Sequence, residues 1–132
     1  MKNSSIKKII NAPISIGELV DKITILEIKK NKLQNSKLEN VLKELSFLRE
    51  LMAKHQIEIT DNLFTQLKEI NLKLWIIEDQ IRIKEKNKEF DNIFIELARS
   101  VYFTNDKRSE IKKRINRLSN SEITEEKSYA KY

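Results

Sequence analysis

The chain has 132 residues and a net charge of +6, with 35% charged residues, one glycine, one proline and no cysteine. This length supports one domain with a modest core, and so few glycines and prolines favour an almost entirely helical protein. The lack of cysteine excludes disulfides and thiolate chemistry, and no apolar run approaches the roughly 20 residues that cross a bilayer. We therefore expect a cytoplasmic protein without a membrane span.

The positive charge is spread along the whole chain among acidic residues, and most of it comes from lysine. No zinc-finger, RRM or KH motif is present, and helix-turn-helix geometry does not suit long helices. A composition rich in Lys, Asn and Ile accounts for the charge without a polyanionic partner. We predict that nucleic acid is not the partner.

The chain begins with a predicted flexible, basic arm over residues 1–14, which Pro13 keeps out of a helix. Ser15 and Glu18 then form a capping-box pattern that predicts a helix to about residue 34. Its apolar stripe consists of Ile16, Leu19, Val20, Ile23, Leu26 and Leu33. Glu27 falls inside this stripe, whereas Asp21, Thr24 and Ile28 line one flank.

Three further helices are predicted over about residues 36–55, 60–88 and 90–118, and the first of these three begins with another capping-box pattern at Ser36 and Glu39. Short connections predict an all-α, antiparallel bundle of four helices over residues 15–118, in which the last two helices are long. A C-terminal tail covers residues 119–132. It is either disordered or laid along the bundle by Ile123 and Tyr129.

Two rows of side chains run along residues 70–85. An apolar seam contains Ile70, Leu74, Ile77 and Ile81, and a neighbouring polar row contains Asn71, Trp75, Glu78, Arg82 and Glu85. The spacing of four and three residues places each row on one side of a helix. Polar groups at a core boundary must be paired or hydrated, so the second row is the unusual feature of this helix.

The last predicted helix also changes character, because Thr104, Asn105, Arg108 and Lys112 follow positions that are apolar earlier in it. In antiparallel helices joined by short turns, residues equally far from the turn lie side by side. By this rule the polar face of the last helix lies at the same height in the bundle as the polar row and Glu27. We expect Arg108 to fork onto Glu27 or Glu78, since a guanidinium pairs bidentately with a carboxylate. Each of these residues breaks the binary pattern alone, but together they can satisfy one another.

Two interpretations of the polar layer formed by these residues are open. It is either a ligand site or a salt-bridge network that fixes the helix register. On the first, the ligand-binding residues are Glu27, Asn71, Trp75, Glu78, Arg82, Asn105, Arg108 and Lys112. No catalytic residue is assigned, and whether any reaction occurs stays undecided. We predict no metal and no cofactor, because Glu18 is engaged in a cap and Asp79 points away from Glu78. The only histidine, His55, is read as a helix-end side chain.

Four blocks resemble a bacterial and phage family of small helical proteins with no established activity. They are SIGELVDKITILEIK (15–29), LWIIEDQIR (74–82), FIELARSVYFTNDKRSEIKKRIN (94–116) and EEKSY (125–129). Members are often encoded near glycosyltransferases and are sometimes labelled lipopolysaccharide biosynthesis proteins. The resemblance implies a setting in surface-polysaccharide (lipopolysaccharide) biosynthesis but no reaction. From the polar layer we predict a small anionic or sugar-phosphate ligand, and a glycosyltransferase is one predicted partner. The alternative is a non-enzymatic interaction module that forms a homodimer or docks through Ile25, Phe47, Ile76 and Ile83.

Overall fold

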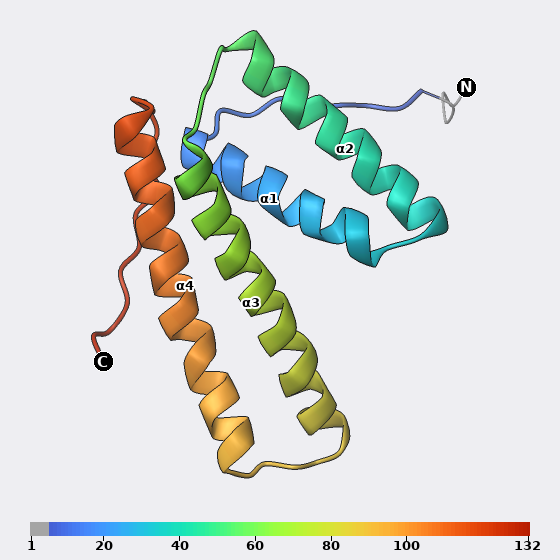
Figure 1. Ribbon diagram of the computed structural model, residues 1–132, viewed down its shortest axis with the longest axis vertical. Helices are drawn as coiled ribbons and strands as arrows, with labels where there is room; N and C mark the ends of the chain where they lie inside the picture. Colours follow the sequence, from blue (N-terminus) through green and yellow to red (C-terminus); the bar gives the residue numbers. More distant parts are fainter. Residues whose placement is uncertain (1–5) are drawn as a thin grey trace.

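A computed structural model describes residues 6–132 as four helices and no strands (Figure 1). The helices are α1 (Ile16–Lys32), α2 (Asn35–Lys54), α3 (Asp61–Lys86) and α4 (Asn92–Leu118). The all-α, four-helix prediction is therefore confirmed. Of the predicted arm, residues 1–5 lie outside the described part of the chain, and residues 6–14 are without secondary structure. No helix within residues 6–132 has the length and apolar character needed to cross a membrane.

Helix α1 lies at the centre of the fold and contacts α2, α3 and α4. It runs antiparallel to α2, α3 runs antiparallel to α4, and α1 and α3 point the same way (Figure 1). The short connection between α2 and α3 predicts that these two helices pack side by side, and this prediction is wrong, because α1 lies between them. The physical reason is that α1 has two buried sides, so it packs between the other helices.

One side of α1 forms a core with α2, and the opposite side forms a core with α3 and α4. Towards α2 the buried residues are Leu19, Ile23, Leu26, Val41 and Leu45. Towards α3 and α4 they are Val20, Leu63, Leu67 and Ile115. Burial of each large aliphatic side chain contributes about 1.5–3 kcal/mol, so both cores depend on α1.

Side-chain caps fix where most of the helices begin. Ser15 Oγ accepts a hydrogen bond from the Glu18 amide at 3.0 Å, and Asp91 accepts one from the Phe94 amide at 3.0 Å. The predicted second capping box at Ser36 is not formed, because α2 begins after Gln34, which makes no side-chain cap. Asn35 has a φ of 58°, a left-handed conformation that Asn tolerates, and this closes the tight turn between α1 and α2.

The α3–α4 hairpin extends well beyond the other helices (Figure 1). Helices α3 and α4 have 26 and 27 residues and α1 has 17, which corresponds to lengths of about 40 Å and 25 Å. We call residues 78–103 the distal hairpin, and no residue in this range is buried. Its turn is closed by Lys84, whose Nζ donates to Asp91 at 2.9 Å and to Glu89 at 3.3 Å.

The tail after α4 folds back along that helix (Figure 1). Ser15 Oγ donates to Glu125 at 2.7 Å, and the Tyr132 hydroxyl donates to Asp106. The Tyr132 ring packs against Tyr102 and Phe103. Of the two alternatives for the tail, the structure therefore has the ordered one. The proposed anchors differ, since Ile123 and Tyr129 are exposed.

Candidate functional site

A buried carboxylate, that of Asp21, lies at the centre of a polar cluster between α1, α3 and α4. Its side chain is 1% exposed. Arg108 Nε donates to one oxygen at 3.0 Å, and a second guanidinium nitrogen donates to the other oxygen. Asn71 Nδ2 donates to the first oxygen at 2.9 Å and to the Thr24 hydroxyl at 2.8 Å. This bidentate, multiply bonded arrangement is the geometry that a buried ion pair requires.

A second ion pair lies one turn along α1. Lys112 Nζ donates to Glu18 at 2.5 Å and lies 3.8 Å from an Asp21 oxygen. Two acids therefore face two bases, and the cluster carries no net charge. The hydrogen bond from its guanidinium to Asp21 raises the pKa of Arg108 above its usual value, so Arg108 stays charged.

The start of α1 is held tightly against α4 and the tail. The amides of Ile16 and Gly17 donate to Ser121 at 3.1 Å and to Asn116 Oδ1 at 2.6 Å. A Cβ on Gly17 would come within 2.5 Å of the Lys112 carbonyl oxygen, so only glycine permits this approach. Since these first amides are already bonded, the helix start is not open to an anion.

A cavity of about 360 Å³ adjoins the polar cluster, and we call it the lateral cavity. It opens between α1, α3 and α4 and is lined by Ile25, Ile28, Asn71, Leu74, Trp75, Glu78, Asp79, Arg82 and Arg108. Five of the eight predicted ligand-binding residues therefore line one cavity: Asn71, Trp75, Glu78, Arg82 and Arg108. Its size and its mixture of apolar and polar groups suit a small ligand.

Glu27 lies elsewhere, and its predicted contact with Arg108 is wrong. It accepts from Arg49 of α2 at 2.8 Å and from Lys68 of α3 at 3.0 Å. Six residues correspond to about 120° around a helix, so Glu27 points to a different side of α1 from Asp21. Desolvation favours a higher pKa for Glu27, but hydrogen bonds and charge from Arg49 and Lys68 outweigh it and lower the pKa.

The other predicted residues agree with the expected contacts only in part, because Glu78 and Arg82 pair as their four-residue spacing predicts but Arg108 does not bond Glu78. Glu78 pairs with Arg82 at 3.1 Å within α3, and the structure gives Arg108 to Asp21 in its place. Asn105 accepts a hydrogen bond from Arg108 at 3.4 Å, and Lys112 joins the polar cluster by donating to Glu18. The expected fork of Arg108 is thus present, but on an acceptor that the sequence analysis left on the flank of α1.

The acceptor that sequence reasoning missed, Asp21, had a detectable signal. Gly17, Asp21, Thr24 and Ile28 follow one another at steps of four, three and four residues, and all four are buried. This spacing defines a continuous row on one side of a helix. Small and polar residues in such a row indicate close packing and hydrogen bonding rather than solvent exposure.

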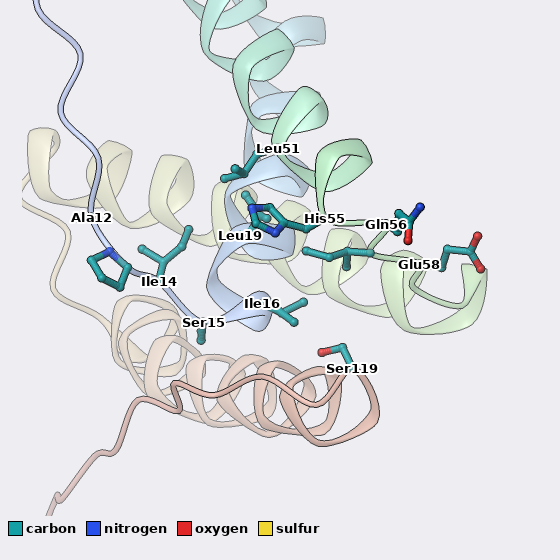
Figure 2. A pocket seen from close by; sticks show the side chains of 12 residues that line it. Ala12, Ile14, Ser15, Ile16, Leu19, Leu51, His55, Gln56, Glu58 and Ser119 are labelled. Carbon is teal, nitrogen blue, oxygen red and sulfur yellow. The ribbon is translucent and has the colours of Figure 1, made fainter.

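A larger cavity of about 660 Å³, which we call the end cleft, lies between the arm, the end of α2 and the end of α4 (Figure 2). Figure 2 shows His55 beside Leu19 and Leu51, with Ile14 of the arm on one side and Ser119 on the other. Its floor is mainly apolar, and His55 is exposed.

The lateral cavity is the better candidate site even though the end cleft is larger. A binding group is most effective when surrounding hydrogen bonds fix its position. Arg108 at the lateral cavity is held by a buried carboxylate, whereas the end cleft has exposed arm residues as one wall. Within residues 6–132, no group of three or more His, Asp or Glu side chains is arranged to hold a metal ion.

Comparison with known proteins places the chain in a family. Residues 10–132 match the model described as "Family of unknown function (DUF6165)". The chain belongs to this family. No curated protein and no solved structure matches the chain. Because the DUF6165 description assigns no activity, the role of the polar cluster has to be argued from its own geometry.

Proposed function

We propose that this DUF6165 protein binds a small sugar phosphate, or a related anionic sugar derivative, in the lateral cavity. The observation that carries the proposal is the fork between Arg108 and buried Asp21. It fixes a guanidinium at the wall of a cavity that also contains Trp75, Glu78 and Arg82. Positioned charge beside an aromatic ring and carboxylates is suited to a ligand with both a sugar and a phosphate.

Each part of such a ligand has a matching group. The Trp75 ring offers a flat apolar surface to a sugar ring, and the Glu78 and Asp79 carboxylates accept hydrogen bonds from hydroxyl groups. Arg82 is 77% exposed and pairs only within its helix. An exposed pair of this kind contributes about 0.3–0.5 kcal/mol, so a phosphate can take Arg82 from Glu78 at little cost.

The charge balance divides the work between the two arginines. Asp21 neutralises most of the charge of Arg108, which leaves mainly the nitrogen that lies 3.4 Å from Asn105 for further bonding. Arg82 therefore supplies the principal charge for the phosphate, and Arg108 supplies an oriented N–H group. In this account Asp21, Thr24 and Asn71 position Arg108.

The biological setting that we propose is surface-polysaccharide biosynthesis. It rests on the resemblance to proteins encoded near glycosyltransferases and on the ligand class that the cavity suits. A glycosyltransferase, which transfers a sugar from a phosphate-activated donor, is the partner that this setting favours. The proposed role is to hold a sugar phosphate, with no reaction assigned.

Trp75 is the only tryptophan, so its fluorescence reports on the lateral cavity alone. We would titrate the full chain with glucose 1-phosphate, UDP-glucose and inorganic phosphate. We expect a saturable change with at least one of the two sugar ligands. Arg82→Gln should weaken that binding about tenfold, the loss of one charge-assisted contact of about 1.4 kcal/mol.

The matched control is Arg99→Gln, because Arg99 is also exposed and also pairs with a glutamate in its own helix. It should bind as the unchanged protein does. The proposal fails if none of the three ligands changes the fluorescence, or if Arg99→Gln weakens binding as much as Arg82→Gln. Arg108→Leu is unsuitable here, because it would leave the buried Asp21 carboxylate without its main partner.

A second candidate function is that of a helical interaction module, in which the polar cluster only fixes helix register. The observation that favours it is the distal hairpin, whose residues 78–103 include no buried side chain. A helix normally buries one apolar side against another element, so this part of the chain lacks a layer.

A further inference from the structure

The outer half of the α3–α4 hairpin carries most of the large apolar side chains that the helices expose. Those between residues 72 and 103 are Leu72, Ile76, Ile83, Phe90, Ile93, Ile95, Tyr102 and Phe103. In Figure 1 the lower end of α3 extends past α1 and α2 with only α4 beside it, whereas Leu74 and Trp75 still lie near α1 at the lateral cavity. An apolar concentration of this kind on one projecting element marks an interaction surface.

On α3 these side chains follow one stripe. Leu72, Ile76 and Ile83 are spaced by four and seven residues, and we call these three side chains the outer stripe. The three apolar positions lie about 100–140° around α3 from Asn71, the residue that binds α1. The outer stripe therefore faces away from α1. Ile76 and Ile83 are 45% and 58% exposed.

Charge decides what kind of partner fits this surface. Residues 72–106 contain six Lys or Arg and seven Asp or Glu, which gives a net charge of −1. Since the whole chain has a net charge of +6, the remaining residues have a net charge of +7. Because residues 72–106 are nearly neutral, their surface does not favour a strongly charged partner. A polyanion would bind the basic remainder instead.

A second copy of the chain meets these requirements. In an antiparallel pair of α3 helices whose two-fold axis passes between residues 79 and 80, Ile76 of each copy comes opposite Ile83 of the other. The stripe is thus complementary to itself, as a two-fold interface must be. The antiparallel arrangement also places the two +7 bodies at opposite ends, separated by more than the Debye length of about 8 Å.

We propose that two copies associate antiparallel through the outer stripes of their α3 helices. This deepens the second candidate function by naming the partner, and it does not depend on ligand binding. Few apolar side chains per copy place the interface at the small end of the known range, so we expect a Kd on the order of 10 µM.

The test is sedimentation equilibrium of the full chain between about 1 and 200 µM. We expect the mass to rise from 15.7 kDa towards twice that value as the concentration increases. The double variant Ile76→Glu, Ile83→Glu should weaken association at least tenfold, and its circular dichroism should be unchanged because both residues are exposed. Phe47→Glu is the matched control, since Phe47 is 43% exposed on α2.

Three results would overturn the inference. The first is a constant monomer mass over the whole range. The second is association of the double variant with the unchanged Kd, and the third is an equal loss in Phe47→Glu. None of these results bears on the Trp75 titration, so the dimer and the ligand proposal can fail separately.

Discussion

The two halves of the α3–α4 hairpin share the same helices but differ in what surrounds them. The proximal half packs on α1 through buried Leu67 and Ile115, and through the Asp21–Arg108 pair. The distal half, residues 78–103, buries no residue, and its ion pairs link residues close in sequence, such as Glu78 with Arg82. The same two helices are therefore packed into the core in one half and accessible in the other.

Charge stabilises the fold in the proximal half and is available for binding in the distal half. A buried, bidentate pair cannot lose one partner without leaving an unpaired charge in the interior. An exposed pair within a helix contributes little and exchanges partners readily. The lateral cavity lies at the boundary between the halves, so it combines a fixed Arg108 with an exchangeable Arg82.

The largest expected difference between the halves concerns their acidic residues. Asp21→Ala leaves Arg108 without its buried partner and should lower the free energy of unfolding by about 3–5 kcal/mol. Glu78→Ala removes an exposed pair and should cost less than about 1 kcal/mol. Urea unfolding followed by circular dichroism measures both. Equal effects would show that the halves do not differ in this way.

Gly17 provides the next test of the proximal half. Gly17→Ala adds a Cβ that would lie 2.5 Å from the Lys112 carbonyl oxygen, so α1 and α4 must move apart. We expect a loss of about 1–3 kcal/mol from this overpacking, although alanine is the better helix former by about 1 kcal/mol. Thermal unfolding gives the sign. A variant that melts at a higher temperature would contradict the close approach.

The smallest effect expected is a pH dependence at Glu27. Since Arg49 and Lys68 lower its folded pKa below 4.5, its contribution to stability is complete above pH 4.5 and is lost as the pH falls through the folded pKa. Glu27→Gln should therefore be less stable than the unchanged protein at pH 7, and the difference should shrink towards pH 3. Glu96→Gln, which disrupts an exposed pair with Arg99, is the control. A difference that grows on acidification would show the opposite sign of pKa shift.

The helices and much of the site were predictable from local pattern. The seam and polar row of residues 70–85 predicted α3 and the neighbouring positions of Asn71, Trp75, Glu78 and Arg82, all of which line the lateral cavity. Helical periodicity fixes which residues share a side, and this requires no knowledge of the other helices.

The partner of Arg108 was not predictable in the same way. Reflecting the helices about short turns predicts which residues lie at the same position along the bundle axis. It does not fix the rotation of each helix about its own axis. Ile28, next to Glu27, lines the cavity with Trp75, so the predicted level of Glu27 along the bundle axis was nearly correct. Glu27 itself faces Arg49 and Lys68. The position of α2 was missed because nothing in the pattern of α2 showed that α1 has two buried sides.

The coupling between Asp21 and Arg108 holds the proximal half together and fixes the wall of the lateral cavity, and a double-mutant cycle measures it directly. The free energy of unfolding would be determined for the unchanged protein, Asp21→Asn, Arg108→Leu and the double variant. We predict a coupling of about 2 kcal/mol or more, with the double variant less destabilised than the two single effects added together. Additive effects, within about 0.5 kcal/mol, would contradict the buried fork and remove the fixed wall of the proposed ligand site.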